Sequence, residues 1–257
     1  MRIASLLFLA ASLLLPMAAV AADPTDSRCF ELRVYTANPG KLDALNARFR
    51  DHTIEIFNRH GITSLGYWTP LENPDNKLYY VLSFPSREAR EKAWKEFSAD
   101  PDWKKAQAES EANGKLVSKV ESTFLQATDF SPAIQPSTAG APRVFELRTY
   151  HATPGNLPIL LKRFREHTLT LFTRHGMTNL YYWTLLPGQT GSENTLVYMI
   201  AHPSKDAGDA QFREFRADPE WIAAKDASEK EGGGSLTILP DGVSSVYMQA
   251  TDYSPTR

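Results

Sequence analysis

A carboxylate, a guanidinium and a phenol occur at alternate positions in two places along the chain. The two triplets are Glu31, Arg33 and Tyr35, and Glu146, Arg148 and Tyr150. Side chains two residues apart on a β-strand share a face, so each triplet would project together. An arginine placed in this way can bind a carboxylate or an enolate, while the glutamate or tyrosine moves a proton. The alternative is a glutamate–arginine pair that satisfies itself where two sheets meet.

Histidines form the second candidate group. His60 and His175 each precede a glycine at a predicted helix end, where a cation is favoured and can cap free carbonyls. His52 and His167 lie eight residues earlier. Eight helical residues span about 12 Å, too far for one metal ion to bind both, so no metal site is predicted. His52 or His167 could be a general base, an axial haem ligand or an ordinary hydrogen-bonded buried histidine.

Aromatic side chains form the third candidate group, and they are concentrated in two predicted strands of each half of the chain. They include Tyr67, Trp68, Tyr80, Tyr182, Trp183 and Tyr198. Such rings usually pack in a core, although some of them can line a pocket for a flat apolar ligand.

Several classes of protein are excluded by composition. The chain of 257 residues has a formal net charge of −2 and no basic segment, so no nucleic-acid partner is expected. It has neither a glycine-rich phosphate loop nor a G-x-S-x-G motif. Cys29 is the single cysteine, so no intrachain disulfide can form, and Val144 takes its place in the second half.

The chain contains an internal repeat. Residues 30–69 recur as residues 145–184, and 24 of these 40 positions are identical. The match resumes as KLYYVLSFPS against TLVYMIAHPS and ends with LQATDFSP against MQATDYSP. The fold question therefore concerns one unit of about 100 residues that is present twice.

Each unit shows the pattern strand, helix, strand, strand, helix, strand. In the first copy, alternation predicts a strand over 30–35 and helical spacing predicts a helix over 42–60. A hairpin follows over 62–69 and 78–84, then a helix from Ser86 that breaks at Asp100 and Pro101, and a last strand over 119–130. This order is the ferredoxin-like βαββαβ pattern of an α+β protein.

The N-terminal segment and the middle of the chain predict where its domains begin and end. Residues 1–22 have the apolar run and small-residue end of a secretory signal peptide, so the protein is expected to be secreted or periplasmic, with no membrane span after cleavage. Residues 131–143 contain three prolines and read as a linker. The predicted domains are therefore 23–130 and 144–257.

Two such units can bury their bare sheet faces against each other within one chain. We expect an intrachain pseudo-dimer that needs no second copy of the chain, with the triplets of the leading strands turned into the barrel interior. The alternative is two independent domains on a proline-rich linker.

The string FELRVYTANPGKL, the helix ending in HG and the strand containing GYW resemble the NIPSNAP family over residues 29–130 and 144–254. Tyr181 departs from the pattern, because it replaces the glycine before Tyr and Trp. The resemblance implies a dimeric α+β barrel and no particular reaction. Family members are associated with mitochondria, protein partners and vesicle traffic in animals. The wider superfamily includes cofactor-free monooxygenases, isomerases and haem proteins.

No committed catalytic set is present, so the leading hypothesis is an exported, non-catalytic binding module without a cofactor. Its partner would be a small apolar or aromatic ligand, or another protein. One alternative is a cofactor-independent oxygenase or isomerase that uses Arg33 or Arg148 to stabilise an anion and His52 or Glu31 as a base. The other is a haem-binding protein.

Overall fold

The computed structural model describes residues 26–138 and 143–257. The predicted signal peptide lies outside the described residues, as do residues 139–142 of the predicted linker. Among the described residues, no helix combines the length and the apolar character that a membrane crossing requires.

The first repeat follows the predicted order of elements. Its strands are β1 (Cys29–Ala37), β2 (Thr63–Pro70), β3 (Lys77–Phe84) and β4 (Val117–Ala127). Its helices are α1 (Leu42–Arg48), α2 (Ile54–Arg59), α3 (Arg87–Ala99) and α4 (Pro101–Ser110). A π-helical turn, Phe49–Thr53, joins α1 to α2, so the single helix expected over 42–60 is locally widened. Thr53 Oγ1 donates to the carbonyl of Arg48 at 3.1 Å in this turn.

The second repeat has the same elements. Its strands are β5 (Val144–His151), β6 (Thr178–Leu185), β7 (Thr195–His202) and β8 (Val243–Ala250). Its helices are α5 (Leu157–Arg163), α6 (Leu169–Arg174), α7 (Lys205–Ala217) and α8 (Pro219–Glu231), and the π-helical turn is Phe164–Thr168. In both repeats a serine caps the third helix, and an aspartate followed by proline opens the fourth.

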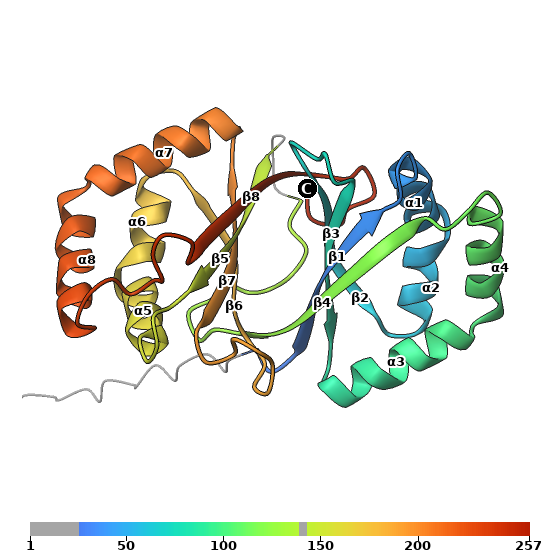
Figure 1. The fold of residues 1–257 in the computed structure, drawn as a ribbon, viewed down its shortest axis with the longest axis horizontal. Helices are drawn as coiled ribbons and strands as arrows, with labels where there is room; N and C mark the ends of the chain where they lie inside the picture. The colour runs from blue at the N-terminus through green and yellow to red at the C-terminus, as the bar shows by residue number, and fades with distance from the viewer. Residues whose placement is uncertain (1–25, 139–142) are drawn as a thin grey trace, which may run out of the picture.

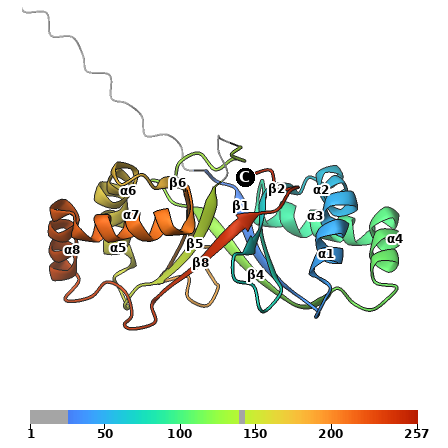
Figure 2. The same cartoon turned by 90° about the horizontal axis from the view of Figure 1, so that it is seen from above.

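The eight strands form one closed barrel in the order β1-β3-β2-β8-β5-β7-β6-β4. The repeats join at two corners, where β2 pairs with β8 from Trp68 to Pro70 and β4 pairs with β6 from Leu125 to Ala127. Figures 1 and 2 show α1–α4 at one end of the molecule and α5–α8 at the other, with the strands between them. The expected α+β barrel built from two ferredoxin-like units is confirmed.

The core has three layers of side chains. One cluster fills the barrel between the two sheets and includes Phe30, Leu32, Phe145 and Leu147. A second lies between the first sheet and α1–α4, and a third lies between the second sheet and α5–α8. Both faces of each sheet are therefore buried.

The expected orientation of the two triplets is wrong. Glu31, Arg33 and Tyr35 point toward the helices, and Glu146, Arg148 and Tyr150 do the same, while Phe30 and Leu32 point into the barrel. The reason is where each buried carboxylate finds hydrogen-bond donors. The cluster inside the barrel is apolar, whereas the helix layer offers hydrogen-bond donors to a buried carboxylate.

The segments that follow the last strands are exchanged between the repeats. After β4, the backbone N–H of Thr128 donates to the carbonyl of Tyr182 in the second repeat at 3.0 Å. After β8, Thr256 Oγ1 donates to the carbonyl of Leu65 in the first repeat at 2.5 Å. Residues 128–130 consequently lie beside the second repeat, although the sequence assigned them to the last strand of the first.

Candidate functional site

The Glu31 carboxylate is the centre of a buried polar cluster in the first repeat. Arg90 donates to its two oxygens from Nε and Nη2 at 2.8 and 2.7 Å. Trp94 Nε1 and Ser122 Oγ add bonds of 3.0 and 2.6 Å, and Arg33 Nη1 completes the set. Burial alone would raise the pKa of Glu31, but these donors outweigh it and lower the pKa to about 2. An ionised carboxylate with so many donors is a poor proton acceptor at neutral pH.

Arg33 connects this cluster to two tyrosines. Its Nε donates to Tyr80 Oη at 2.8 Å, and its Nη2 donates to Tyr35 Oη at 3.3 Å. Tyr80 in turn stacks on Tyr67, with the ring centroids 5.4 Å apart. The structure thus brings together five of the predicted site residues in the sheet–helix layer: Glu31, Arg33, Tyr35, Tyr67 and Tyr80.

The second repeat holds the corresponding carboxylate, Glu146, with different partners. Gly208 stands where Arg90 stands in the first repeat, and His202 replaces Phe84. The fully buried His202 places Nε2 3.1 Å from Glu146 Oε2 and Nδ1 2.7 Å from Gln211 Oε1. A Cβ atom at Gly208 would lie 3.0 Å from His202 Cγ, so this histidine needs the glycine beside it.

The other predicted site residues of the second repeat, except Trp183 and His167, also lie in its sheet–helix layer. Arg148 donates to Glu146 and, at 3.3 Å, to Tyr150 Oη, and Tyr198 Oη also donates to Tyr150 Oη at 3.1 Å. Tyr182 stacks on Tyr198 at 5.2 Å. These rings face the helix layer and form part of its core.

Trp68 and Trp183 lie apart from the other candidates, inside the barrel. Trp68 packs on Phe145 of the second repeat at 5.7 Å, and Trp183 packs on Phe30 of the first at 5.9 Å. Within the described residues neither indole N–H has a hydrogen-bond partner. Their packing joins the two repeats.

The four histidines singled out in the sequence, His52, His60, His167 and His175, join neither cluster. His52 is exposed and lines a pocket of about 220 Å³ between α2 and α4, and His167 is half-buried in the second π-helical turn. Typical pockets for drug-sized ligands are about 300–1,000 Å³, so the pocket at His52 does not fit a haem. Nε2 of His60 and of His175 lies 2.7 and 2.9 Å from the aspartate that caps the last helix of its repeat. The described part of the chain contains no cluster of three metal-ligating side chains.

A buried arginine that was not among the predicted site residues lies next to the polar cluster. Arg48, the last residue of α1, is 6% exposed and lies with its guanidinium carbon 5.1 Å from the ring centroid of Trp103. Its Nη1 donates to Glu111 Oε1 at 3.1 Å and to Ser110 Oγ at 3.3 Å. Its Nε is buried without a partner among the described residues.

Arg48 lines a pocket of about 290 Å³ where the start of β4 passes α1 and α4. Tyr35 from β1 and Trp103 from α4 line the same pocket, and so do Lys115 and Lys119. With Glu111, the lining contains three cationic side chains and one carboxylate. The signal that could have identified Arg48 is its identity in both copies, in RFRDHT and RFREHT.

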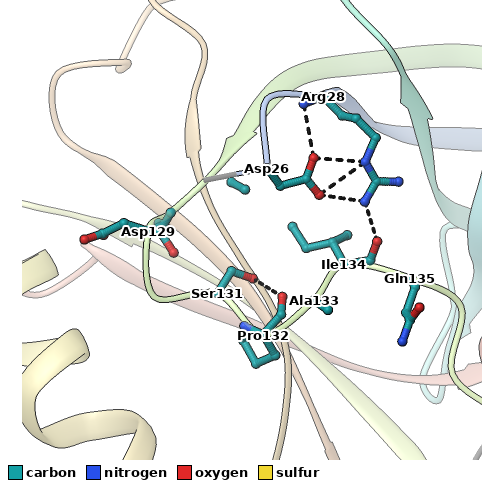
Figure 3. A pocket seen from close by; sticks show the side chains of 10 residues that line it. Asp26, Arg28, Asp129, Ser131, Pro132, Ala133, Ile134 and Gln135 are labelled. Carbon is teal, nitrogen blue, oxygen red and sulfur yellow. Dashed lines mark hydrogen bonds and ion pairs between the residues drawn. The ribbon is translucent and has the colours of Figure 1, made fainter. Parts of the chain in front are cut away.

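A pocket of about 570 Å³ lies where Asp26 and Arg28 meet residues 127–135 (Figure 3). Its charged groups are already paired. Arg28 donates to Asp26 and to the carbonyl of Ile134, and Asp129 accepts two bonds from Arg165. This pocket therefore offers less unsatisfied polarity than the one at Arg48.

The comparisons with solved structures extend along the whole tandem chain. A candidate monooxygenase from Fusobacterium nucleatum is 12% identical, with a TM-score of 0.58 over 87% of this chain and 92% of that one. An anthrone oxidase-like protein is 14% identical, with a TM-score of 0.57 over 90% and 94% of the two chains. At these identities the likeness shows the fold alone.

A NIPSNAP family protein of unknown function from Agrobacterium tumefaciens is 24% identical over 42% of this chain and 95% of its own, with a TM-score of 0.38. No curated protein matches the chain. The NIPSNAP family profile matches residues 30–132 and again residues 145–234, which together make up most of the sequence. The chain belongs to the NIPSNAP family and contains two copies of its domain.

Proposed function

We propose that the protein is a non-catalytic binding module that holds a small carboxylate ligand in the pocket at Arg48. The observation that carries the proposal is the buried Arg48 guanidinium, which lines the pocket and has an unpartnered Nε. A buried donor without an acceptor costs about 1–3 kcal/mol, so an anionic ligand that approaches this guanidinium would find an incompletely satisfied group.

The chain itself shows how its arginines accept carboxylates. Arg50 donates from Nε and Nη2 to Asp252 at 2.8 and 2.7 Å, and Arg165 donates from the same two atoms to Asp129 at the same distances. Arg90 uses this edge for Glu31. In Arg48 only Nη1 is engaged by a carboxylate, so the Nε edge supports carboxylate as the ligand group.

The rest of the pocket supports a ligand that is small and partly apolar. Trp103 and Tyr35 supply aromatic surface, and Lys115 and Lys119 add positive charge at the exposed side. The volume of about 290 Å³ is near the lower limit for small-molecule sites. A small aromatic acid combines these properties.

Binding without catalysis follows from the state of the nearby carboxylates. An oxygenase or isomerase that removes a proton needs a free base at the ligand. Glu31 is held ionised by its donors, and Glu111 is paired with Arg48. Glu31 is therefore not poised to accept a proton.

Isothermal titration with sodium benzoate and sodium acetate tests the proposal. We expect saturable binding to the unmodified protein and a loss of at least about tenfold in affinity in Arg48→Met, because a charge-assisted contact is removed. Lys104→Met is the control, since Lys104 is an exposed lysine of α4 next to Trp103 in sequence. No binding of either acid, or equal binding by Arg48→Met, would refute the carboxylate site.

We also propose that the protein is exported, because residues 1–22 have the composition of a signal peptide. N-terminal sequencing of the protein from its own host should find cleavage after Ala22. A retained Met1 in the mature protein would contradict export by this route.

A further inference from the structure

Arg163, the last residue of α5, corresponds to Arg48 but has lost its counter-ion. It is 7% exposed, and its guanidinium carbon lies 5.0 Å from the ring centroid of Trp221. Its Nη1 donates to Ser228 Oγ at 3.2 Å, and its Nε is buried without a partner among the described residues. The second repeat therefore buries a cation against a neutral hydroxyl and an aromatic ring.

A single substitution between the repeats explains the missing carboxylate. Glu229 occupies the position of Glu111, but Lys225 binds it with Nζ 2.6 Å from Oε2. The first repeat has Gln107 where the second has Lys225, and there the glutamate stays with the arginine. Within the described residues, no carboxylate oxygen lies within 4.0 Å of the Arg163 guanidinium.

An uncompensated buried charge is strongly unfavourable, so it is normally paired or hydrogen-bonded. Burial lowers the pKa of Arg163, and nearby Tyr150 and Glu229 offset this only in part. The pKa of Arg148, which belongs to the polar cluster of the same repeat, is raised, since nearby tyrosines and Glu146 outweigh the effect of burial there. Arg148 also has a buried Nε without a partner among the described residues, but its Nη1 donates to Glu146, so it keeps the counter-ion that Arg163 lacks.

We propose that Arg163 is a second, separate anion-binding site, and that it takes the carboxylate group of a small free acid. In Arg50, Arg90 and Arg165 the Nε edge binds a carboxylate, whereas the buried Nε of Arg163 has no hydrogen-bond acceptor among the described residues. Ser228 holds the opposite side of the guanidinium and fixes its plane. The carboxylate of the ligand would take the place of Glu229, which is paired with Lys225.

The site is independent of the proposed function of the first repeat. Arg48 lies on α1 and Arg163 on α5, and Figure 1 shows these helices at opposite ends of the molecule. Each site can therefore fail without the other, and a variant of one arginine reports on its own repeat.

The test is an NMR titration of the full chain that follows the arginine Nε–H signals. Arg163→Met and Arg48→Met assign the two signals by their disappearance. Sodium acetate is added against sodium chloride at the same ionic strength. We expect a saturable shift of the Arg163 signal with acetate only, and the same titration in Arg48→Met. No shift, or an equal shift with chloride, would overturn the proposal.

Lys225→Gln provides a second variant that keeps Arg163 in place. Restoring the residue type of the first repeat should return Glu229 to Arg163 and weaken acetate binding at this signal by about tenfold or more. Lys162→Gln is the matched control, because Lys162 is an exposed lysine of α5 that pairs with Glu231 at 3.5 Å. Unchanged acetate affinity in Lys225→Gln would show that Glu229 does not compete for the site and would refute this account.

Discussion

At the scale of single residues, the two repeats compensate the same buried glutamate in two different ways. Arg90 donates to Glu31, whereas His202 lies beside Glu146, and Gly208 leaves room for the imidazole. Changing either partner alone would have left a buried carboxylate less well paired. The divergence of the repeats is therefore a coupled exchange rather than a scatter of neutral changes.

The first prediction concerns Glu31→Gln. Removal of this charge leaves Arg33 and Arg90 buried without their carboxylate, so we expect a loss of about 3–5 kcal/mol in the free energy of unfolding. Urea denaturation measures it. Glu109→Gln is the control, because Glu109 is exposed and its lysine partner is 4.0 Å away, and its effect should stay within about 0.5 kcal/mol. If Glu31→Gln lowered the free energy of unfolding by no more than this control, the stabilising role of the cluster would be contradicted.

The same carboxylate predicts a pH dependence of stability. The pKa of Glu31 is lowered from 4.5 to about 2 on folding, so its contribution is full above about pH 4.5 and is lost as the pH falls toward 2. A shift of this size corresponds to about 3 kcal/mol. Denaturation of the unmodified protein and of Glu31→Gln should show a gap that narrows between about pH 5 and pH 2.5. A constant gap would disagree with the lowered pKa.

At the scale of elements, the order of strands and helices could be predicted because alternation, helical spacing and capping residues all agree. Which face of each leading strand meets the helices could not be predicted. Phe30, Leu32, Glu31 and Arg33 alternate clearly, yet both faces of β1 are buried, so alternation alone does not say which one meets the helices. The face is decided by the partners of the buried carboxylate, which come from much later in the chain: Arg90 for Glu31 and His202 for Glu146.

The π-helical turns are a second feature that spacing does not reveal. The turn after Arg48 inserts an extra residue into the helical repeat, and both Arg48 and Phe49 are then buried. An uninterrupted helix places consecutive residues about 100° apart, so an arginine beside the apolar stripe reads as exposed. This is why Arg48 was not among the candidates, whereas Tyr35, which lines the same pocket, was one of them.

The second strand of the first repeat, β2, supplies a prediction at this scale. A Cβ atom at Gly66 would lie 2.3 Å from the Trp68 ring, and this tryptophan is fully buried. We expect Gly66→Ala to destabilise the protein by about 1–3 kcal/mol through overpacking. Thermal and urea unfolding measure the effect, with Thr63→Ala at the exposed start of β2 as the control. A neutral Gly66→Ala would mean that the barrel interior is looser than the structure indicates.

At the scale of the whole molecule, each repeat covers the sheet face that the other cannot protect. Duplication in the sequence, together with one bare face per unit, was sufficient to predict this closed barrel. The exchanged segments after β4 and β8 were not predicted, because no local pattern says on which repeat a short irregular segment packs. They add contacts such as the bond from Tyr67 N–H to Ser254 Oγ at 2.9 Å.

The isolated first repeat, residues 23–130, provides a test of assembly. It would expose the apolar face that includes Phe30, Leu32, Leu65, Trp68, Val81 and Leu125. A patch of this kind favours association, so we expect light scattering to find dimers or larger species, while the full chain is monomeric. A well-folded, monomeric half would contradict the mutual burial of the two sheets.

If Arg48 receives the carboxylate of a ligand, a crystal soaked with sodium benzoate will show it. We expect electron density for benzoate in the pocket lined by Tyr35 and Trp103, with its carboxylate within about 3 Å of the Arg48 guanidinium. An empty pocket, or benzoate bound only elsewhere on the molecule, would contradict it.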